Sequence, residues 1–331
     1  MSCHDISFEI RLYFHALLWS AMKSLVTGCA GFIGSHLTDK LLQEGHEVIG
    51  IDCFTDYYPR EIKENNIKSA ISHKNFTFIE EDILNITEFP RVDCVFHQAA
   101  QAGVRASWGK YFETYTRNNI LATQKLLEYY KELDLGKFVF ASSSSVYGNA
   151  KELPIREDAP KNPFSPYGVT KLAAENLCSL YSMNYGTPVV SLRYFTVYGP
   201  RQRPDMGINK FVHAVLKGEV IEIYGDGNQT RDFTYVSDAV QANLLAAESE
   251  AAGEILNIGG GSRISVNELI RQIEEAVGKK AHVKKISAQK GDVEHTYAEV
   301  AKAEKTIGYV PSVGIREGIK KYVDSVVLQS S

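Results

Sequence analysis

The chain has 331 residues, of which 44% are hydrophobic and 23% charged, so it can bury one large core or two moderate ones. Its 36 Lys and Arg residues nearly balance 40 Asp and Glu residues, and no long run of like charges occurs, which excludes a basic surface for nucleic acid or a membrane. No stretch approaches the roughly 18 consecutive apolar residues of a membrane-spanning helix. A small molecule is therefore the expected partner.

The cysteines and histidines give no sign of a disulfide framework or a metal site. The five cysteines are scattered and form no CxxC pair, and the nine histidines show neither HxxxH nor HExxH spacing. We therefore expect no bound metal and a reducing, cytoplasmic location.

Residues 1–21 contain a mildly apolar run, LYFHALLWSA, but no convincing basic segment or cleavage site of a signal peptide. The strand pattern KSLVTG follows Met22 at once. We therefore expect residues 1–21 to be an N-terminal extension without function.

Short apolar runs alternate with longer helical patterns over residues 22–195, as in βαβ units. Helical spacing of apolar residues covers 34–43, 115–133 and 167–185. This alternation predicts an α/β fold with a doubly wound parallel sheet of the Rossmann type. The strands expected in it are SLVTG, EVIGID, FTFIEED, CVFHQAA, KFVFASSSS and TPVVSLRYF.

Gly and Pro clusters break this rhythm from Thr196 onward. We expect residues 196–331 to form mainly a smaller C-terminal α/β domain that binds the substrate. Two later segments, around 232–238 and 254–259, still have the pattern of buried strands and are expected to be interleaved with the first domain.

A glycine-rich turn joins the first strand to the first helix, in the sequence TGCAGFIGSH. Gly28 permits the tight turn, Gly31 lets the backbone approach a pyrophosphate, and Gly34 lets the helix pack on the strand. Phe32 and Ile33 lie between the last two glycines. Because strand, turn and helix follow in this order, the segment predicts a dinucleotide site.

Acidic residues end the next two strands. Asp52, at the end of EVIGID, can accept hydrogen bonds from an adenosine ribose and repels a 2′-phosphate, which favours NAD over NADP. Asp82 and Ile83, at the end of the third strand, lie where the adenine is expected, although Asp82 could equally be a solvated acid.

Tyr167 and Lys171 lie four residues apart in SPYGVTKLAAE, so on a helix both side chains project from one face. A phenol with a pKa of about 10 is a poor base at neutral pH, but an adjacent ammonium group and a positively charged nicotinamide lower that pKa. The serine run 142–145 follows the strand KFVFA, at the sheet edge where ligands bind. We expect the Ser143 hydroxyl to bridge Tyr167 and the reacting oxygen.

Several segments stand in the order of one known family: TGCAGFIGSH, HQAA, SSSSVYG, SPYGVTK, RYFTVYGPRQRPDM, YGDGNQTRDFTYVSD and NIGGG. On these motifs the chain from Met22 onward resembles the extended short-chain dehydrogenases/reductases, in their nucleotide-sugar epimerase and dehydratase group. The resemblance implies NAD as the cofactor and a UDP-sugar as the substrate.

The resemblance implies roles for further residues. Residues 97–100, which include Ala99 and Ala100, would line the cofactor, Asn119 would support the nicotinamide, and Tyr194 with Val197 would close the pocket. In relatives, the helix that follows Tyr115 and the helix that carries Tyr167 form the four-helix bundle of a dimer, so a homodimer is expected.

The segment RYFTVYGPRQRPDM discriminates within the group. Galactose-type 4-epimerases usually carry Asn in place of Thr196, whereas FTVYGP followed by RPDM resembles UDP-glucuronate 4-epimerases. The hydroxyls of Ser143, Ser144, Ser145 and Thr196 can bind a C6 carboxylate without a fixed counter-charge. We therefore expect UDP-glucuronate to be converted into UDP-galacturonate through a transient 4-keto sugar, with Tyr167 as the base.

Arginines are expected to hold the diphosphate, because a guanidinium fork matches phosphate oxygens. Arg203 and Arg231 are the main candidates, and Arg105 can either reach the nucleotide or form a surface ion pair. Asp292 is a further substrate-site candidate. It lies in QKGD, where relatives show Arg before the Gly-Asp pair.

Three other functions stay open. A UDP-glucose or UDP-N-acetylglucosamine 4-epimerase would share the chemistry without the carboxylate site. A UDP-glucuronate decarboxylase or a dehydratase is a second alternative, although Ser144 and Ser145 stand where a 4,6-dehydratase carries its acid pair. An NAD-binding scaffold or sensor would not need Tyr167 and Lys171.

Overall fold

The computed structural model describes residues 22–287 and 293–330. The expected N-terminal extension and Asp292 lie outside the described residues. Within the described part of the chain, no helix is both long and apolar enough to cross a membrane.

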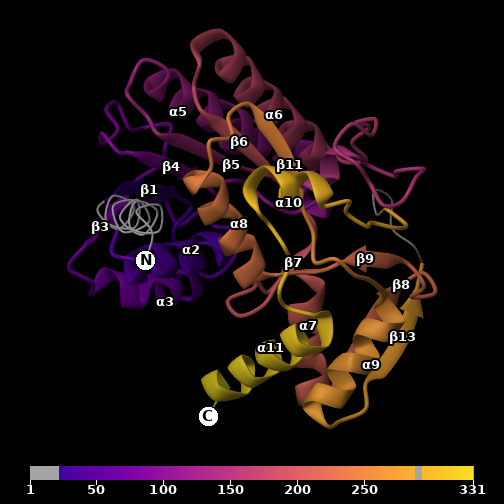
Figure 1. The fold of residues 1–331 in the computed structure, drawn as a ribbon. Helices are drawn as coiled ribbons and strands as arrows, with labels where there is room; N and C mark the ends of the chain where they lie inside the picture. Colours follow the sequence, from indigo (N-terminus) through magenta and orange to yellow (C-terminus); the bar gives the residue numbers. More distant parts are fainter. Residues whose placement is uncertain (1–21, 288–292, 331) are drawn as a thin grey trace, which may run out of the picture.

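A seven-stranded parallel sheet forms the centre of the molecule (Figure 1), in the order β11-β6-β5-β4-β1-β2-β3. The strand order reverses between β1 and β4, so the crevice for a ligand opens beyond the carboxyl ends of these two strands. The predicted Rossmann-type α/β fold is confirmed. The strands are β1 Lys23–Thr27, β2 Glu47–Asp52, β3 Phe76–Glu80, β4 Cys94–His97, β5 Lys137–Ser143, β6 Val189–Tyr194 and β11 Glu254–Ile258.

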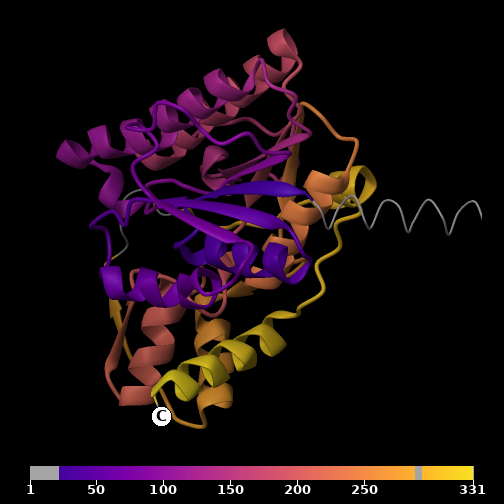
Figure 2. The ribbon, with the colours of Figure 1, turned by 90° about the vertical axis from the view of Figure 1, so that its left-hand side faces the viewer.

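Helices cover both faces of this sheet (Figures 1 and 2). Successive side chains of a strand point to opposite faces, so Val26 of β1 packs with the core beneath α2 and α8, whereas Leu25 packs with the core beneath α5 and α6. The helices of the first face are α2 Phe32–Gln43, α3 Arg60–Ile71 and α8 Val236–Glu248. Those of the second are α4 Phe112–Tyr115, the π-helical turn η3 Thr116–Leu121, α5 Ala122–Tyr130 and α6 Pro166–Tyr185.

The C-terminal part forms a smaller lobe below the sheet in Figure 1. Its strands pair only two at a time: β8 with β13, β9 with β12, and β7 with β10. Its elements are β7 Val197–Tyr198, α7 Gly207–Lys217, β8 Val220–Tyr224, β9 Thr230–Asp232, β10 Thr234–Tyr235, β12 Arg263–Ser265, α9 Val266–Val277, β13 His282–Ile286 and α11 Ile315–Ser330. The helix α10 Ala301–Ile307 instead lies beside β11 of the large sheet (Figure 1).

The two later segments expected in the first domain behave differently. β11 lies beside β6 in the large sheet, whereas β10 pairs with β7 in a separate ladder. Within residues 232–238, the strand β10 is only two residues long, and α8 begins directly after it at Val236.

The ends of α6 follow from local sequence. Ser165 caps the helix by accepting a hydrogen bond from the backbone N–H of Gly168 (3.1 Å), and Pro166 occupies the first turn, where its missing N–H costs nothing. Gly186 ends the helix in the left-handed conformation, with φ of 70°. The register of Tyr167 and Lys171 on this helix is thus fixed by its N-terminal cap.

A buried ion pair ties α6 to the sheet. The Arg193 side chain of β6 donates from Nε and Nη2 to the two carboxylate oxygens of Glu175 on α6, at 2.9 and 2.6 Å. Ser142 of β5 donates to the same carboxylate at 2.6 Å. Arg193 also donates to the Tyr147 hydroxyl at 2.6 Å, and that hydroxyl donates to Asn257 of β11 at 2.7 Å. One network therefore joins α6 to three strands.

Replacing Arg193 by Met tests the energetic weight of this network. The change leaves the Glu175 carboxylate buried and without its partner, so the free energy of unfolding should fall by about 3–5 kcal/mol, measured by urea denaturation. Arg271→Met is the matched control, because Arg271 pairs with Glu268 and Glu275 on an exposed helix face. Equal shifts of the two denaturation midpoints would contradict the prediction.

Candidate active site

One cleft opens at the point where the strand order reverses. It receives residues from the glycine turn, from the ends of β2, β3, β4 and β5, and from α6 and the 203–205 segment. Its lining residues include the following: Gly28, Gly31, Phe32, Ile33, Gly34, Asp52, Tyr57, Tyr58, Lys63, Asp82, Ile83, Gln98, Ala99, Ala100, Gln101, Asn118, Ser142, Tyr167, Lys171, Tyr194 and Arg203.

The glycine turn leaves no room for side chains. Gly28 has φ of 70°, and a Cβ there would lie 2.8 Å from the backbone N of Ala99. A Cβ on Gly34 would lie 2.1 Å from the carbonyl oxygen of Gly28. Gly31 precedes α2 without a side-chain cap, so the first turn of α2 is open at the cleft. A helix N-terminus reached by bare backbone fits the pyrophosphate of a dinucleotide.

Asp52 is held in place by backbone donors. Its carboxylate accepts hydrogen bonds from the N–H groups of Ala30 (3.1 Å) and Phe54 (2.9 Å). Burial raises the pKa of Asp52, while these bonds and the nearby Lys63 ammonium act in the opposite direction. The position at the end of β2 fits a carboxylate that binds ribose hydroxyls.

Lys63 also lines the cleft, and it was not predicted as a site residue. It lies on α3, and its ammonium group donates to the carbonyl oxygen of Thr55 and lies 4.5 Å from the centre of the Tyr58 ring. Burial lowers the pKa of Lys63. In the sequence, the only sign of this role is that Lys63 follows Asp52 by 11 residues, and this spacing is a weak signal.

The predicted residues of the adenine and nicotinamide ends fall into two groups. Asp82, Ile83, Ala99 and Ala100 line the cleft, and Asp82 also caps its own turn by accepting from the N–H of Leu84 (2.9 Å). Asn119 does not line the cleft. Its side chain accepts from the N–H of Gln101 (2.7 Å) and donates to Thr170 of α6 (3.0 Å).

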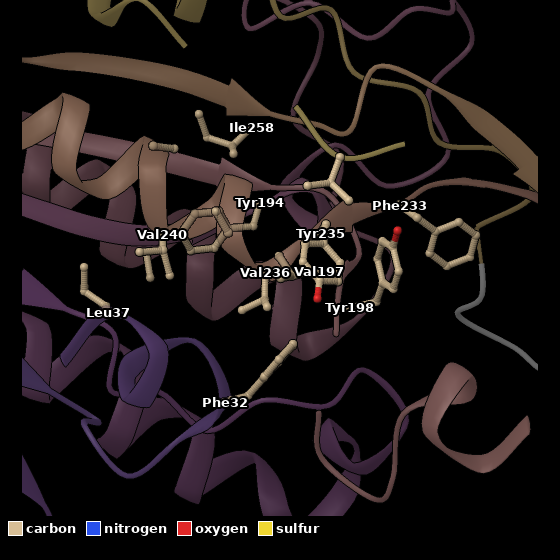
Figure 3. Close-up of a cluster of buried hydrophobic side chains, with 14 of the residues drawn as sticks. Phe32, Leu37, Tyr194, Val197, Tyr198, Phe233, Tyr235, Val236, Val240 and Ile258 are labelled. Carbon is tan, nitrogen blue, oxygen red and sulfur yellow. The ribbon is translucent and has the colours of Figure 1, made fainter. Parts of the chain in front are cut away.

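Tyr194 and Val197, expected together at the pocket, are separated in the structure. Tyr194 lines the cleft, and its hydroxyl accepts a hydrogen bond from Asn243 of α8 (2.7 Å). Val197 is buried in the hydrophobic cluster with Phe233 and Tyr235 (Figure 3). Val197 is not among the residues that line the cleft.

Tyr167 and Lys171 both line the cleft from α6. The Tyr167 ring packs edge-on against Tyr115. Burial raises the pKa of Tyr167, and the nearby Ser143 side chain and the positive charge of Arg203 act against this rise. Burial lowers the pKa of Lys171 to about 8.

Lys171 and the nicotinamide were the positive charges expected to lower the pKa of the phenol. Ser143 and Arg203 are further protein groups that lower it. Because the net shift is upward, the buried phenol needs further positive charge before it becomes a base at neutral pH.

The expected hydroxyls follow two neighbouring strand ends. Ser143 ends β5 opposite Tyr194 of β6, and Thr196 comes two residues later. The Ser143 hydroxyl also accepts from the N–H of Ser145 (3.1 Å), which fixes the turn that contains Ser144. Ser143 contacts Tyr167, whereas Ser144 and Ser145 are half-buried beside it.

The three arginines expected at the diphosphate have different partners in the structure. Arg203 lines the cleft and forms a two-point ion pair with Asp205, at 2.9 and 3.0 Å. Arg105 stacks on the ring of Tyr224 of β8, with 4.1 Å between the guanidinium carbon and the ring centre.

Arg231 forms hydrogen bonds with the backbone at the start of the described residues 293–330. It donates to the carbonyl oxygens of Val293 (2.6 Å) and Glu294 (3.1 Å).

The family and the relatives that match this chain agree with a dinucleotide site in the cleft. The model of the NAD dependent epimerase/dehydratase family matches residues 24–259. The chain belongs to this family. A UDP-glucuronate 4-epimerase of Thermodesulfobacterium geofontis is 40% identical over 308 residues, which cover 91% of this chain and 94% of that protein.

Solved structures agree with the family assignment. The crystal structure of UDP-glucuronic acid 4-epimerase from Bacillus cereus with UDP-glucuronic acid and NAD has a TM-score of 0.89 and 43% identity, and it covers 93% of this chain and 100% of that one. A UDP-N-acetylglucosamine 4-epimerase from Methanobrevibacter ruminantium has a TM-score of 0.87 and 33% identity, and it covers 93% of this chain and 99% of that one. NAD is therefore the cofactor that the glycine turn and Asp52 fit.

Replacing Gly34 by Ala should abolish NAD binding, because the added methyl group would collide with the Gly28 carbonyl and push α2 away from the turn. Calorimetric titration of NAD checks this. Gly207→Ala is the matched control, since Gly207 starts α7 and a Cβ there meets no atom within 4 Å. An unchanged affinity for NAD in Gly34→Ala would contradict the prediction.

Proposed function

We propose that the protein interconverts UDP-glucuronate and UDP-galacturonate by epimerisation at C4. The observation that carries the proposal is the placement of Tyr167 and Lys171 in the same cleft as the glycine turn and Asp52. A base and a dinucleotide site that share one cleft can oxidise a hydroxyl and reduce the resulting ketone again.

The chemistry needs a proton acceptor and a hydride acceptor on one carbon. When bound, NAD accepts the C4 hydride and returns it. The Tyr167 oxygen takes the proton of the C4 hydroxyl, Ser143 orients that hydroxyl, and the same phenol gives the proton back after the sugar has turned. Lys171 holds positive charge close to the site, and the cationic nicotinamide supplies the further charge that the buried phenol requires.

The carboxylate of the sugar is the second part of the proposal. Ser143, Ser144, Ser145 and Thr196 offer neutral hydroxyl donors at the ends of β5 and β6. Neutral donors bind the C6 carboxylate without pulling it into the geometry in which the 4-keto acid loses carbon dioxide. The similarity to two UDP-glucuronate 4-epimerases supports this choice of sugar.

We assign the diphosphate to Arg203 and Arg231, with Arg105 at the mouth of the site. Arg105 and Arg231 both contact the C-terminal lobe, and Arg203 lies at its border with the cleft. Anchoring the diphosphate while the sugar ring stays free lets the ketone present either face to the hydride. Asp292 remains a proposed substrate contact outside the described residues.

The direct test is incubation of the purified protein with UDP-glucuronate without added NAD, followed by proton NMR of the product. UDP-galacturonate should form without release of carbon dioxide, UDP-glucose should react far more slowly, and Tyr167→Phe should lose at least about 100-fold in rate. Faster turnover of UDP-glucose or UDP-N-acetylglucosamine would contradict the carboxylate assignment. Carbon dioxide would indicate a decarboxylase, and full activity of Tyr167→Phe would reject the catalytic assignment.

Ser143 offers a pH-dependent test. Its side chain lowers the pKa of Tyr167, so Ser143→Ala should raise that pKa, move the acidic limb of the kcat profile to higher pH and lower kcat by about 100-fold. Ser143→Thr keeps the hydroxyl and should keep the profile. An acidic limb that stays in place in Ser143→Ala would contradict the role.

We also propose a cytoplasmic homodimer. The cysteines that the structure describes are free. The α6 helix and the turn before α4 expose apolar side chains, with Tyr111 at 56%, Leu180 at 48% and Met183 at 74% exposure. A second copy would cover these side chains, so light scattering should give twice the mass of one chain. Leu180→Arg should halve it, whereas Leu328→Arg on α11 should not; an unchanged mass in Leu180→Arg contradicts the interface.

A further inference from the structure

We propose that Tyr57 is a clasp that closes the cofactor cleft and keeps NAD bound between turnovers. The proposal rests on the function proposed above, because an epimerase returns the hydride to the molecule that gave it and therefore needs no exchange of cofactor. It concerns residues 53–59, the segment between β2 and α3, which has no role in the mechanism proposed above.

A constrained turn at Phe54 sets the direction of this segment. Phe54 has φ of 48°, a left-handed conformation that is rare for a bulky residue. The conformation is held because the Phe54 N–H donates to Asp52 (2.9 Å) and its ring packs against Phe78, with ring centres 5.6 Å apart. The same carboxylate that is assigned to the ribose thus anchors the start of the clasp.

Tyr57 reaches the opposite side of the cleft. Its hydroxyl donates a hydrogen bond to the Asp205 carboxylate (3.2 Å), and the Arg203 guanidinium lies 5.7 Å from the centre of its ring. Tyr57 and Arg203 both line the cleft. Since Asp205 also holds Arg203 at two points, the phenol joins the β2 side of the sheet to the segment that leads into α7.

Gly103 lies against the hydroxyl end of the Tyr57 side chain. A Cβ at Gly103 would lie 2.2 Å from the Tyr57 hydroxyl oxygen, so only glycine allows the ring to lie there. The loop that carries Gly103 is held in place, because the Tyr115 hydroxyl lies within hydrogen-bond distance of the carbonyl oxygens of Ala102 (2.9 Å) and Gly103 (2.7 Å). Tyr57 therefore contacts the loop that follows β4 as well as the 203–205 segment.

These contacts make cofactor release depend on Tyr57. The loop after β4 carries Ala99 and Ala100 of the cleft lining, and Asp52 and the glycine turn form the opposite wall. A dinucleotide held between these walls leaves only when the phenol moves away from Asp205. A hydrogen bond to a charged acceptor of this kind slows the opening step by about 10- to 100-fold.

The experiment measures the release of NAD from the purified protein, chased with excess fluorescent etheno-NAD. Tyr57→Phe keeps the ring and removes the bond, so it should release NAD about 10- to 100-fold faster than the wild type. Asp205→Ala removes the acceptor of this bond, together with the Arg203 ion pair, and should also speed release. Adding Tyr57→Phe to Asp205→Ala should change the release rate little, because the bond is already absent. Tyr111→Phe, which removes a phenol on the proposed dimer face and outside the cleft lining, is the matched control and should match the wild type.

The outcomes separate the clasp from the epimerase. Thermal melting of each variant shows whether it is folded, and the rate of a single turnover with NAD already bound separates an effect on cofactor release from an effect on the chemistry in Tyr57→Phe. Equal release rates in wild type and folded Tyr57→Phe would overturn the clasp, even if UDP-glucuronate is epimerised. Conversely, a wild type that holds NAD but leaves UDP-glucuronate unchanged would reject the proposed function, while the release rates would still decide the clasp.

Discussion

The fully buried ion pair between Glu175 and Arg193 holds the candidate catalytic helix against the sheet. Desolvating two charges is costly, and the pair is tolerated because Ser142 and Tyr147 complete the hydrogen bonds of its carboxylate and guanidinium. Glu175 lies one helical turn beyond Lys171, so the bond that fixes α6 also fixes the two residues assigned to proton transfer. The position of the candidate base, Tyr167, thus depends on this buried polar network.

The electrostatics of the cleft are suited to a bound cationic cofactor. Burial raises the pKa of Tyr167, with partial compensation from Ser143 and Arg203, and it lowers the pKa of Lys171 to about 8. A phenol in this state is a weak base by itself. In the proposed mechanism it becomes effective when the nicotinamide adds positive charge, which links proton removal to the presence of the hydride acceptor. Retention of NAD and the strength of the base are then two consequences of one closed cleft.

Features that depend on local geometry could be predicted from the sequence. The glycine turn, Asp52, the register of Tyr167 with Lys171 and most strands of the sheet follow from steric limits and periodicity within short segments. The α3 helix was missed because its sequence, REIKENNIKSAI, is largely polar and has only a weak apolar stripe. Lys63 and Tyr57 were missed for a related reason: their importance comes from contacts with residues far away in the chain. The same limit explains Val197, whose side was decided by the pairing of β7 with β10.

The central claim is that one hydride leaves and returns to the same carbon of the same sugar. UDP-glucuronate labelled with deuterium at C4 tests it most directly, with the purified protein in ordinary water and NMR and mass analysis of both sugars at equilibrium. The account predicts that deuterium stays at C4 in UDP-glucuronate and UDP-galacturonate alike. Replacement of deuterium by solvent hydrogen, or its appearance in free reduced cofactor, would contradict it.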